Sequence, residues 1–538
     1  MSLEHYSKKR FLIVDELDNF RFSTKQALMS LGLKQVDTAS SAQAVSSGFQ
    51  NVNYDVVLCN YELGKGKNGQ ELLEELRVKK LLKFTGLFFI ISAEVERGKV
   101  MGTVENEPDG YLVKPVTPKD LDIRLGKALE MKEAMQPIDD ALDQADYETA
   151  LSFCDERLSA KAPYKLTCIK TKAWLLTKLN RLNEAESLYK DLLKNNDALW
   201  AEYGLAKIYL KSRNYKDAEV ILNTIIAKDP DQVEALDLLA ELYRQQGKPQ
   251  EAQVLIEQAI SRSPRSLLRQ KALADVCIEN NDDEAAMAAF RKVVKLGDQS
   301  VYAHPDQYFD FAQLLAKTSA DDDDPDSHEN TKEAFELLSK ANKRFSSVDE
   351  IKIQTKLISA SVNATIGNTE EAEAILEQVM HEDSDEGLDP ETLLVAAKTM
   401  QTLGRDDEAE QTLERAADLA HRDSEQIGEI YDQLNQGIST EARQKASIQN
   451  KKGIKLYNQG ETDQAAAELR LAVPLTPRHI SLNLNLIQVL VKLYKTDKKP
   501  EHLAEIEKYL HRVRHIPKHH REFPRYEYLS NKYQGLGG

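Results

Sequence analysis

The chain has 538 residues, with 88 Asp or Glu against 71 Lys or Arg, so its formal net charge at pH 7 is −17. That charge argues against a protein that binds nucleic acid regardless of sequence, because such binding needs clustered cations that displace counterions. The length exceeds what one hydrophobic core usually organises, so we expect several domains or an extended array.

The expected location is the cytoplasm. No apolar run approaches the roughly 20 residues that span a bilayer. The N-terminal apolar stretch is interrupted by Asp15 and Glu16, which does not fit a signal peptide. The four cysteines lie far apart without a CxxC pair, which favours buried thiols in a reducing compartment over zinc ligands or disulfides. We therefore expect neither membrane nor nucleic-acid partners.

Residues 8–135 alternate short apolar runs with amphipathic segments. The predicted strands are RFLIVD, KQVDTA, YDVVLCN, GLFFIIS and DGYLVKP, in chain order. The predicted helices are KQALMSLG, SAQAVSSGF, GQELLEELR, a segment near ERGKVM, and a long helix from Pro118. Five such units predict an α/β domain with a five-stranded parallel sheet, flavodoxin-like, covered by helices on both faces. Reactive groups then gather at the carboxyl ends of the strands.

Polar side chains stand at or near these strand ends. They are, in chain order, Asp15, Glu16, Asn60, Ser92, Tyr111 and Lys114. Together with Arg21 and the PDGYLVKP segment, this order resembles the receiver domain (CheY-like) of bacterial response regulators. In that family, two acids after the first strand and an aspartate on the third strand bind magnesium, and a histidine kinase phosphorylates that aspartate.

The resemblance implies a role for each matching residue. Asp15 and Glu16 match the acid pair that binds the metal. Ser92 matches the hydroxyl that senses the phosphoryl group, and Lys114 matches the lysine that neutralises it. Tyr111 matches the switching aromatic residue, although it fits a core aromatic residue equally well.

The sequence departs from the family at Asn60, which stands where the phosphoacceptor aspartate belongs. An amide has no carboxylate oxygen to attack phosphorus, and it removes one anionic metal ligand. We therefore predict a pseudo-receiver without phosphorylation at this position, in which Asp15, Glu16 and the backbone carbonyl near Glu62 bind Mg²⁺ only weakly. The substitution could instead be engineered to block phosphorylation, or be a drifted residue in a structural domain.

From about residue 140 the sequence repeats with a period of 34 residues. The positions that recur are Ala206, Tyr209, Ala218 and Pro230, then Ala240, Tyr243, Ala252 and Pro264, then Ala286, and later Gly453, Ala465 and Pro477. Small residues let two antiparallel helices approach closely, and the proline ends each hairpin. The pattern resembles the tetratricopeptide repeat (TPR) family over about three quarters of the chain. That resemblance predicts an all-α superhelical array.

The alanine of the second helix can be followed along the chain. It recurs at Ala150, Ala185, Ala334, Ala372 and Ala409, with a degenerate last unit that uses Ala504. The repeat is interrupted by an acidic loop near Asp321 and by a long insertion before Gly453. The predicted domains are a receiver-like domain at 8–135, a first TPR segment at 136–420, an irregular helical connection at 421–447 and a C-terminal TPR segment at 448–538.

Such an array binds other proteins on the concave face that its first helices form. Because no flexible linker follows the helix from Pro118, we expect a non-enzymatic two-component (phosphorelay) signalling adaptor in which the receiver-like domain regulates or positions the array. A histidine kinase or another signalling protein is the expected partner at the receiver. The alternatives are a phosphorylation-controlled regulator with a blocking Asp-to-Asn change, and an assembly scaffold that oligomerises through the receiver. Asn483 and Asn485 lie in a first helix, but no complete set of carboxylate-binding Lys and Asn residues stands out.

Overall fold

The computed structural model divides the chain into two compact units, Met1–Gln307 and Tyr308–Gly538, which are described separately. The residues that it describes are 7–48, 52–64, 67–92, 108–194, 198–264, 266–298, 300–319, 327–382, 388–420, 430, 440–514, 516 and 522–536. The helix expected near ERGKVM, the acidic segment at Asp321 and most of the connection at 421–447 lie outside them. Among the described residues, no helix is long and apolar enough to cross a membrane.

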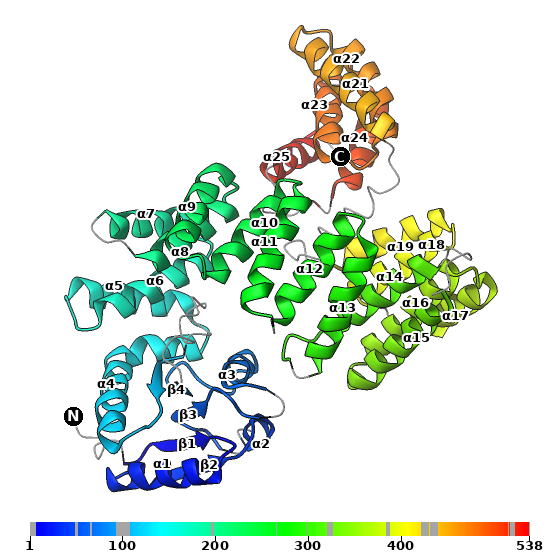
Figure 1. The fold of residues 1–538 in the computed structure, drawn as a ribbon. Helices are drawn as coiled ribbons and strands as arrows, with labels where there is room; N and C mark the ends of the chain where they lie inside the picture. The colour runs from blue at the N-terminus through cyan, green and yellow to red at the C-terminus, as the bar shows by residue number, and fades with distance from the viewer. Residues whose placement is uncertain are drawn as a thin grey trace. The chain divides into compact units, whose positions relative to one another are not determined.

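The first unit begins with a five-stranded parallel sheet in the order β2-β1-β3-β4-β5 (Figure 1). The strands are β1 (Arg10–Val14), β2 (Gln35–Ala39), β3 (Val56–Asn60), β4 (Leu87–Ser92) and β5 (Gly110–Val113). The helices are α1 (Asp18–Ser30), α2 (Ala42–Gly48), α3 (Gly69–Val78) and α4 (Pro118–Asp143). All five predicted strands are therefore present, and the predicted α/β class is confirmed.

Alternate side chains of each strand enter two separate cores. Phe11 and Ile13 of β1 pack in one core with residues of α1 and α4. Leu12 and Val14 pack in the other core with residues of α2 and α3. This alternation, which follows from the two-residue period of a strand, covers both faces of the sheet with helices. The carboxyl edge of the sheet remains for polar groups.

Helix α4 belongs to both the sheet domain and the helical array. It begins at Pro118, and the preceding N-cap residue, Thr117, forms a capping box with Asp120. Its first half contributes Leu125 to the core on the sheet, whereas its second half contributes Ile138 to the core of the first helical hairpin. The domain boundary predicted at 135/136 therefore falls inside one continuous helix. As the sequence indicated, no linker separates the two parts.

The rest of the first unit is a series of antiparallel helical hairpins. Its helices are α5 (Tyr147–Ser159), α6 (Lys165–Lys178), α7 (Leu182–Leu193), α8 (Leu199–Lys211), α9 (Tyr215–Lys228), α10 (Val233–Gln245), α11 (Pro249–Arg262), α12 (Leu267–Glu279) and α13 (Asp283–Gly297). The turns between paired helices each contain one residue with positive φ, such as Asn180, Arg213, Gly247 and Asn281. Their spacing of 33 or 34 residues reproduces the period read from the sequence.

The second unit continues the same architecture. Its helices are α14 (Asp306–Ser319), α15 (Ser327–Arg344), α16 (Asp349–Thr365), α17 (Thr369–Glu382), α18 (Pro390–Thr402), α19 (Asp406–Leu419), α21 (Thr440–Asn458), α22 (Thr462–Ala472), α23 (Ile480–Asp497), α24 (Pro500–Arg512) and α25 (Phe523–Gln534), with a 3₁₀ turn η3 (Val473–Leu475). Helix α21 begins at Thr440, so the boundary predicted at 447/448 also falls inside a helix.

The predicted small residues lie where paired helices cross. Those that are at most 2% exposed are Ala150, Ala185, Ala206, Ala218, Ala240, Ala252, Ala286, Ala334, Ala372, Ala409 and Ala465. At Gly453, a Cβ would lie 2.7 Å from the Leu469 side chain, so α21 and α22 approach too closely for a larger residue. The expectation at Ala504 was wrong. Ala504 is exposed, and His502 is buried instead, with its ring 3.1 Å from the Asp497 carboxylate.

Candidate functional site

The polar residues predicted at the strand ends meet at the carboxyl edge of the sheet. Strand β1 pairs with β3, and β3 with β4, so the residues that end these strands are neighbours. Asn60 pairs in register with Ile91, directly before Ser92, and Asp15 follows Val14, which pairs with Cys59. The topology therefore brings together side chains that are far apart in the sequence.

Asp15 and Lys114 form the charged centre of this edge. The Lys114 Nζ lies 2.9 Å from Asp15 Oδ2, and Asp15 is 0% exposed. The other carboxylate oxygen of Asp15 accepts a hydrogen bond of 2.9 Å from the backbone N–H of Leu17. The Lys114 ammonium also lies 4.1 Å from the ring centroid of Phe20, so its charge is shared between an anion and an aromatic face.

The Asn60 side chain is hydrogen-bonded to the loop that follows β3. It is 8% exposed, and its Nδ2 donates a 2.6 Å hydrogen bond to the backbone carbonyl of Glu62. The same carbonyl was the expected backbone ligand for a metal ion. The amide therefore presents a hydrogen-bond donor to the oxygen that a cation would need.

Two of the expected magnesium ligands already have partners in this structure. Mg²⁺ prefers near-octahedral oxygen ligands, usually with one or two carboxylates. Asp15 already pairs with Lys114, and the Glu62 carbonyl already accepts from Asn60. The Glu16 carboxylate lies over Gly64, where a Cβ would come within 2.2 Å of it. In the described part of the chain, no three His, Cys, Asp or Glu side chains are grouped as metal ligands.

Ser92 and Tyr111 lie on the neighbouring strands of the same edge. Ser92 ends β4 and its carbonyl accepts a 3.0 Å hydrogen bond from the backbone N–H of Lys114. Tyr111 is partly buried against the core beneath α2 and α3, and its carbonyl accepts a 2.7 Å bond from Arg124 of α4. Tyr111 therefore contacts the core without being fully buried. Arg21, the remaining matched residue, donates to the Asp15 carbonyl at 2.5 Å and pairs with Asp18.

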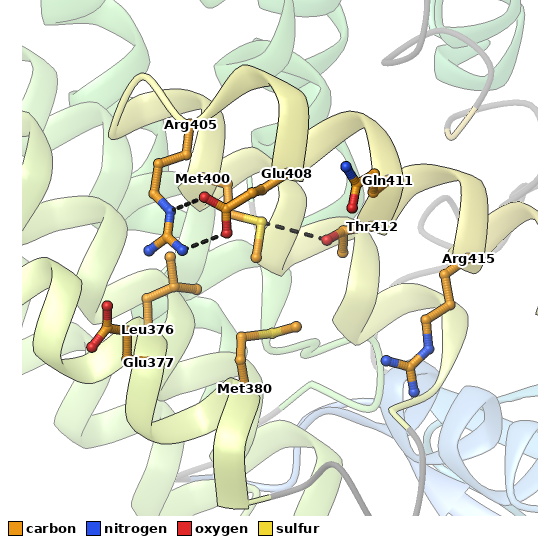
Figure 2. A pocket seen from close by; sticks show the side chains of 9 residues that line it. All are labelled: Leu376, Glu377, Met380, Met400, Arg405, Glu408, Gln411, Thr412 and Arg415. Carbon is orange, nitrogen blue, oxygen red and sulfur yellow. Dashed lines mark hydrogen bonds and ion pairs between the residues drawn. The ribbon is translucent and has the colours of Figure 1, made fainter.

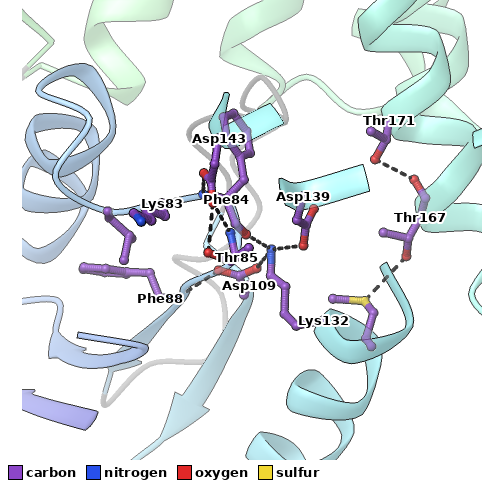
Figure 3. A network of polar contacts seen from close by, with 12 residues as sticks. Lys83, Phe84, Thr85, Phe88, Asp109, Lys132, Asp139, Asp143, Thr167 and Thr171 are labelled. Atoms are coloured by element: carbon purple, nitrogen blue, oxygen red, sulfur yellow. Dashed lines mark hydrogen bonds and ion pairs between the residues drawn. The ribbon is translucent and has the colours of Figure 1, made fainter. Parts of the chain in front are cut away.

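The opposite edge of the sheet contains a second polar network, which sequence reasoning missed (Figure 3). Lys132 of α4 donates to the Phe84 carbonyl at 2.6 Å and lies 3.4 Å from both Asp109 and Asp139. Asp143, the last residue of α4, accepts from the Phe84 N–H at 2.6 Å and from the Thr85 hydroxyl at 2.9 Å. No recognisable motif marks these residues.

An aromatic contact extends this network into the helical array. The ring of Phe84 lies 6.1 Å from that of Trp174 in α6, which also makes an edge contact of 5.9 Å with Tyr147 in α5. Burial raises the pKa of Asp139 to about 6, against the opposing effect of Lys132. Residues of the sheet domain, α4 and the first hairpins thus form one packed junction.

A separate cavity of about 390 Å³ lies among α17, α18 and α19 in the second unit (Figure 2). Met380 and Met400 line it together with other side chains. Its charged lining residues are Glu377, Arg405, Glu408 and Arg415, of which Arg405 and Glu408 are paired with each other at 2.9 Å. The Thr412 hydroxyl donates to the Met400 sulfur. The cavity therefore has a mixed lining, in which Leu376 and two methionines lie beside polar and charged side chains.

Comparison with known families agrees with both halves of this structure. The family model for the response regulator receiver domain matches residues 11–125, and a tetratricopeptide repeat model matches 176–242, 243–304 and 367–431. Chemotaxis protein CheY-3 of Vibrio cholerae is 27% identical over 121 residues, which are 22% of this chain and 92% of that protein. Chemotaxis protein CheY of Pseudomonas aeruginosa is 26% identical over 121 residues, 22% of this chain and 96% of its own length.

A solved structure is similar to the helical part. A tetratricopeptide repeat protein from Parabacteroides merdae aligns with 56% of this chain and 98% of its own length, at 16% identity and a TM-score of 0.32. The assignment of the repeats therefore depends on the family match and on the observed helical hairpins. The chain combines an N-terminal response regulator receiver domain with a series of tetratricopeptide repeats.

Proposed function

We propose that this protein is a non-enzymatic signalling adaptor, in which a receiver domain without a phosphoacceptor positions a protein-binding TPR array. The observation that supports this most is the hydrogen bond from the Asn60 amide to the Glu62 carbonyl. It replaces an oxygen nucleophile with a nitrogen donor and occupies the expected metal ligand. The receiver then has one resting arrangement, in which Lys114 is already paired with Asp15.

The junction supports a positioning role for the receiver. Helix α4 is the last helix of the sheet domain and the first helix of the array. Lys132 and Asp143, in the second half of this helix, form hydrogen bonds with Phe84 in the loop before β4. A domain attached by a continuous helix and a packed aromatic contact fixes the orientation of the first hairpin. A flexible linker would not.

The test is phosphoryl transfer to the full-length protein. Wild type and Asn60→Asp are incubated with acetyl phosphate and Mg²⁺, and the intact mass of each is measured. We expect no phosphoryl adduct on the wild type, because no carboxylate stands at position 60. An adduct on the wild type would contradict the proposal. An adduct confined to Asn60→Asp, together with altered hydrogen exchange in α5 and α6, would favour a phosphorylation-controlled regulator with a blocked acceptor.

A further inference from the structure

Helices α21 and α23, the first helices of the last two hairpins, lie beside α25, the last described helix, and the three share a row of polar contacts. Helix α23 packs against α21 and against α25. Most of α23 is buried, and its accessible side chains follow a helical spacing that includes Asn485, Gln488 and Lys492. Asn483 lies off this stripe, is fully buried and donates to the carbonyls of Pro477 and His479. It therefore has a structural role, whereas Asn485 lies on the surface.

Hydrogen bonds connect the three helices across this surface. The Asn485 Nδ2 donates to Asn450 Oδ1 of α21 at 2.8 Å. Arg525 of α25 donates to Asn485 Oδ1 at 2.7 Å and to Gln488 Oε1 at 2.8 Å. Its carboxylate contact, with Glu522, is longer at 3.5 Å. A guanidinium binds a carboxylate about twice as strongly as neutral oxygens, so Arg525 has a weaker set of partners than it can form.

A second row of contacts adds cations to the same helices. The Lys492 ammonium lies 4.8 Å from the ring centroid of Tyr457 in α21. Lys532 of α25 donates to the Tyr528 hydroxyl at 2.9 Å, and this bond, helped by Lys495, lowers the pKa of Tyr528. Within the described residues, Lys492, Lys495 and Lys532 form no ion pair with a carboxylate. Their charge is therefore available to a partner.

The distribution of charge distinguishes these three helices from the rest of the segment. Helices α21, α23 and α25 contain nine Lys or Arg and three Asp or Glu. Their paired helices α22 and α24 contain three Lys or Arg and five Asp or Glu. In a chain of net charge −17, these three helices therefore have a net positive charge, and four of their cations, Lys492, Lys495, Arg525 and Lys532, lie on the surface described above. Such a surface attracts an anionic partner and disfavours cationic ones.

We propose that this basic face, defined as Asn450, Asn485, Lys492, Lys495, Arg525 and Lys532, binds an acidic segment of a partner protein. The proposal rests on the protein-binding role of the array and specifies the chemistry of its partner. A carboxylate of that segment replaces the amide oxygens of Asn485 and Gln488 as the partner of Arg525, in a bidentate, charge-assisted hydrogen bond. The lysines then neutralise further carboxylates along the segment.

The experiment uses the full-length protein and two fluorescein-labelled peptides. One peptide alternates Glu with Ser, and the other has Gln in place of every Glu. Fluorescence anisotropy should show binding of the Glu peptide, no binding of the Gln peptide, and a loss of affinity as salt is added. The double variant Lys492→Gln with Lys495→Gln should weaken binding roughly tenfold, since two charges on the face are lost. It leaves the contacts of Arg525 intact, so folding of α25 is not at issue.

The matched control is Lys211→Gln with Lys508→Gln, which removes the same charge from exposed positions on α8 and α24. We expect the control to change affinity less than about twofold. No binding of the Glu peptide at low salt, or an equal loss in the two double variants, would overturn the proposal. Either result would leave the phosphodonor test of the receiver unaffected, so the two proposals fail separately.

Discussion

The two edges of the receiver sheet use their polar residues in different ways. At the carboxyl edge, the partners of Asp15, Asn60 and Lys114 all come from the receiver itself. At the amino edge, Lys132 and Asp143 connect the loop before β4 to a helix that continues into the array. At the carboxyl edge, where phosphorylation occurs in the family, these side chains therefore contact other residues of the receiver. At the amino edge, the polar side chains belong to the helix that leads into the array, and they contact the loop before β4.

This difference separates the polar groups of the candidate site from those that connect the receiver to the array. The Asn60 hydrogen bond does not involve the amino edge, where Phe84 and Trp174 pack between the two parts. Stability at the two edges should therefore respond independently to mutation, because distant sites without shared partners are usually additive.

The largest effect is expected at the carboxyl edge from Lys114→Met. It leaves the Asp15 carboxylate fully buried without its cation, which should cost about 3–5 kcal/mol of local stability. Hydrogen exchange of peptides that cover β1 and β3 measures this loss. Adding Asp15→Asn to the variant should recover part of it, because no buried charge then remains. If the loss of local stability is no greater than in the exposed control Lys119→Met, the ion pair between Lys114 and Asp15 contributes little to stability.

At the amino edge, Phe84→Ala should destabilise the junction by about 2–3 kcal/mol, since it removes a ring packed between the loop and α6. The two tryptophans of the chain, Trp174 and Trp200, both lie in the first hairpins, so their fluorescence follows this region during urea unfolding. Phe22→Ala is the matched control, because Phe22 is 67% exposed. If both variants shift the midpoint equally, the junction is not a stabilising contact.

The sequence was sufficient to predict the carboxyl edge but not the amino edge. Asp15, Asn60 and Lys114 stand in a recognisable order after apolar runs, so the parallel-sheet topology alone brings them together. Lys132 and Asp139 follow no such order, since their partners come from loops whose positions depend on the finished fold. The contacts of these residues depend on the continuation of α4 beyond the sheet.

The repeats show a similar limit. Alanines at 34-residue spacing predicted where paired helices cross, because a close helix approach demands a small residue at a fixed position. The last hairpin departs from that rule, with His502 buried through its contact with Asp497 where a small residue was expected. A polar residue can replace alanine only if a partner satisfies it, and a single sequence does not reveal that partner.

A smaller effect that depends on pH is expected from Asp139→Asn. Burial raises the folded-state pKa of Asp139 from 3.8 to about 6, so the folded protein binds this proton more tightly than the unfolded chain. The stability that Asp139 contributes is then complete below about pH 4 and is lost as the pH rises through about 6, by at most about 3 kcal/mol. The variant should lack this decline in the tryptophan-detected urea midpoint. Asp140→Asn is the neighbouring control. If the stability of Asp139→Asn falls with rising pH as it does in the wild type, another group causes that fall.

The smallest effect, and the sharpest test of the carboxyl edge, is expected from Asn60→Asp. The new carboxylate stands beside Asp15 on the neighbouring strand, so without divalent cations like-charge repulsion should cost about 1–2 kcal/mol in the exchange of β1 and β3. Adding Mg²⁺ should restore this stability, since a bound ion favours the folded state by mass action. The wild type should show no such shift, because the Asn60 amide occupies the Glu62 carbonyl. Equal stabilisation of both proteins by Mg²⁺ would show that the wild-type edge still binds the ion, and that its closure by Asn60 is incomplete.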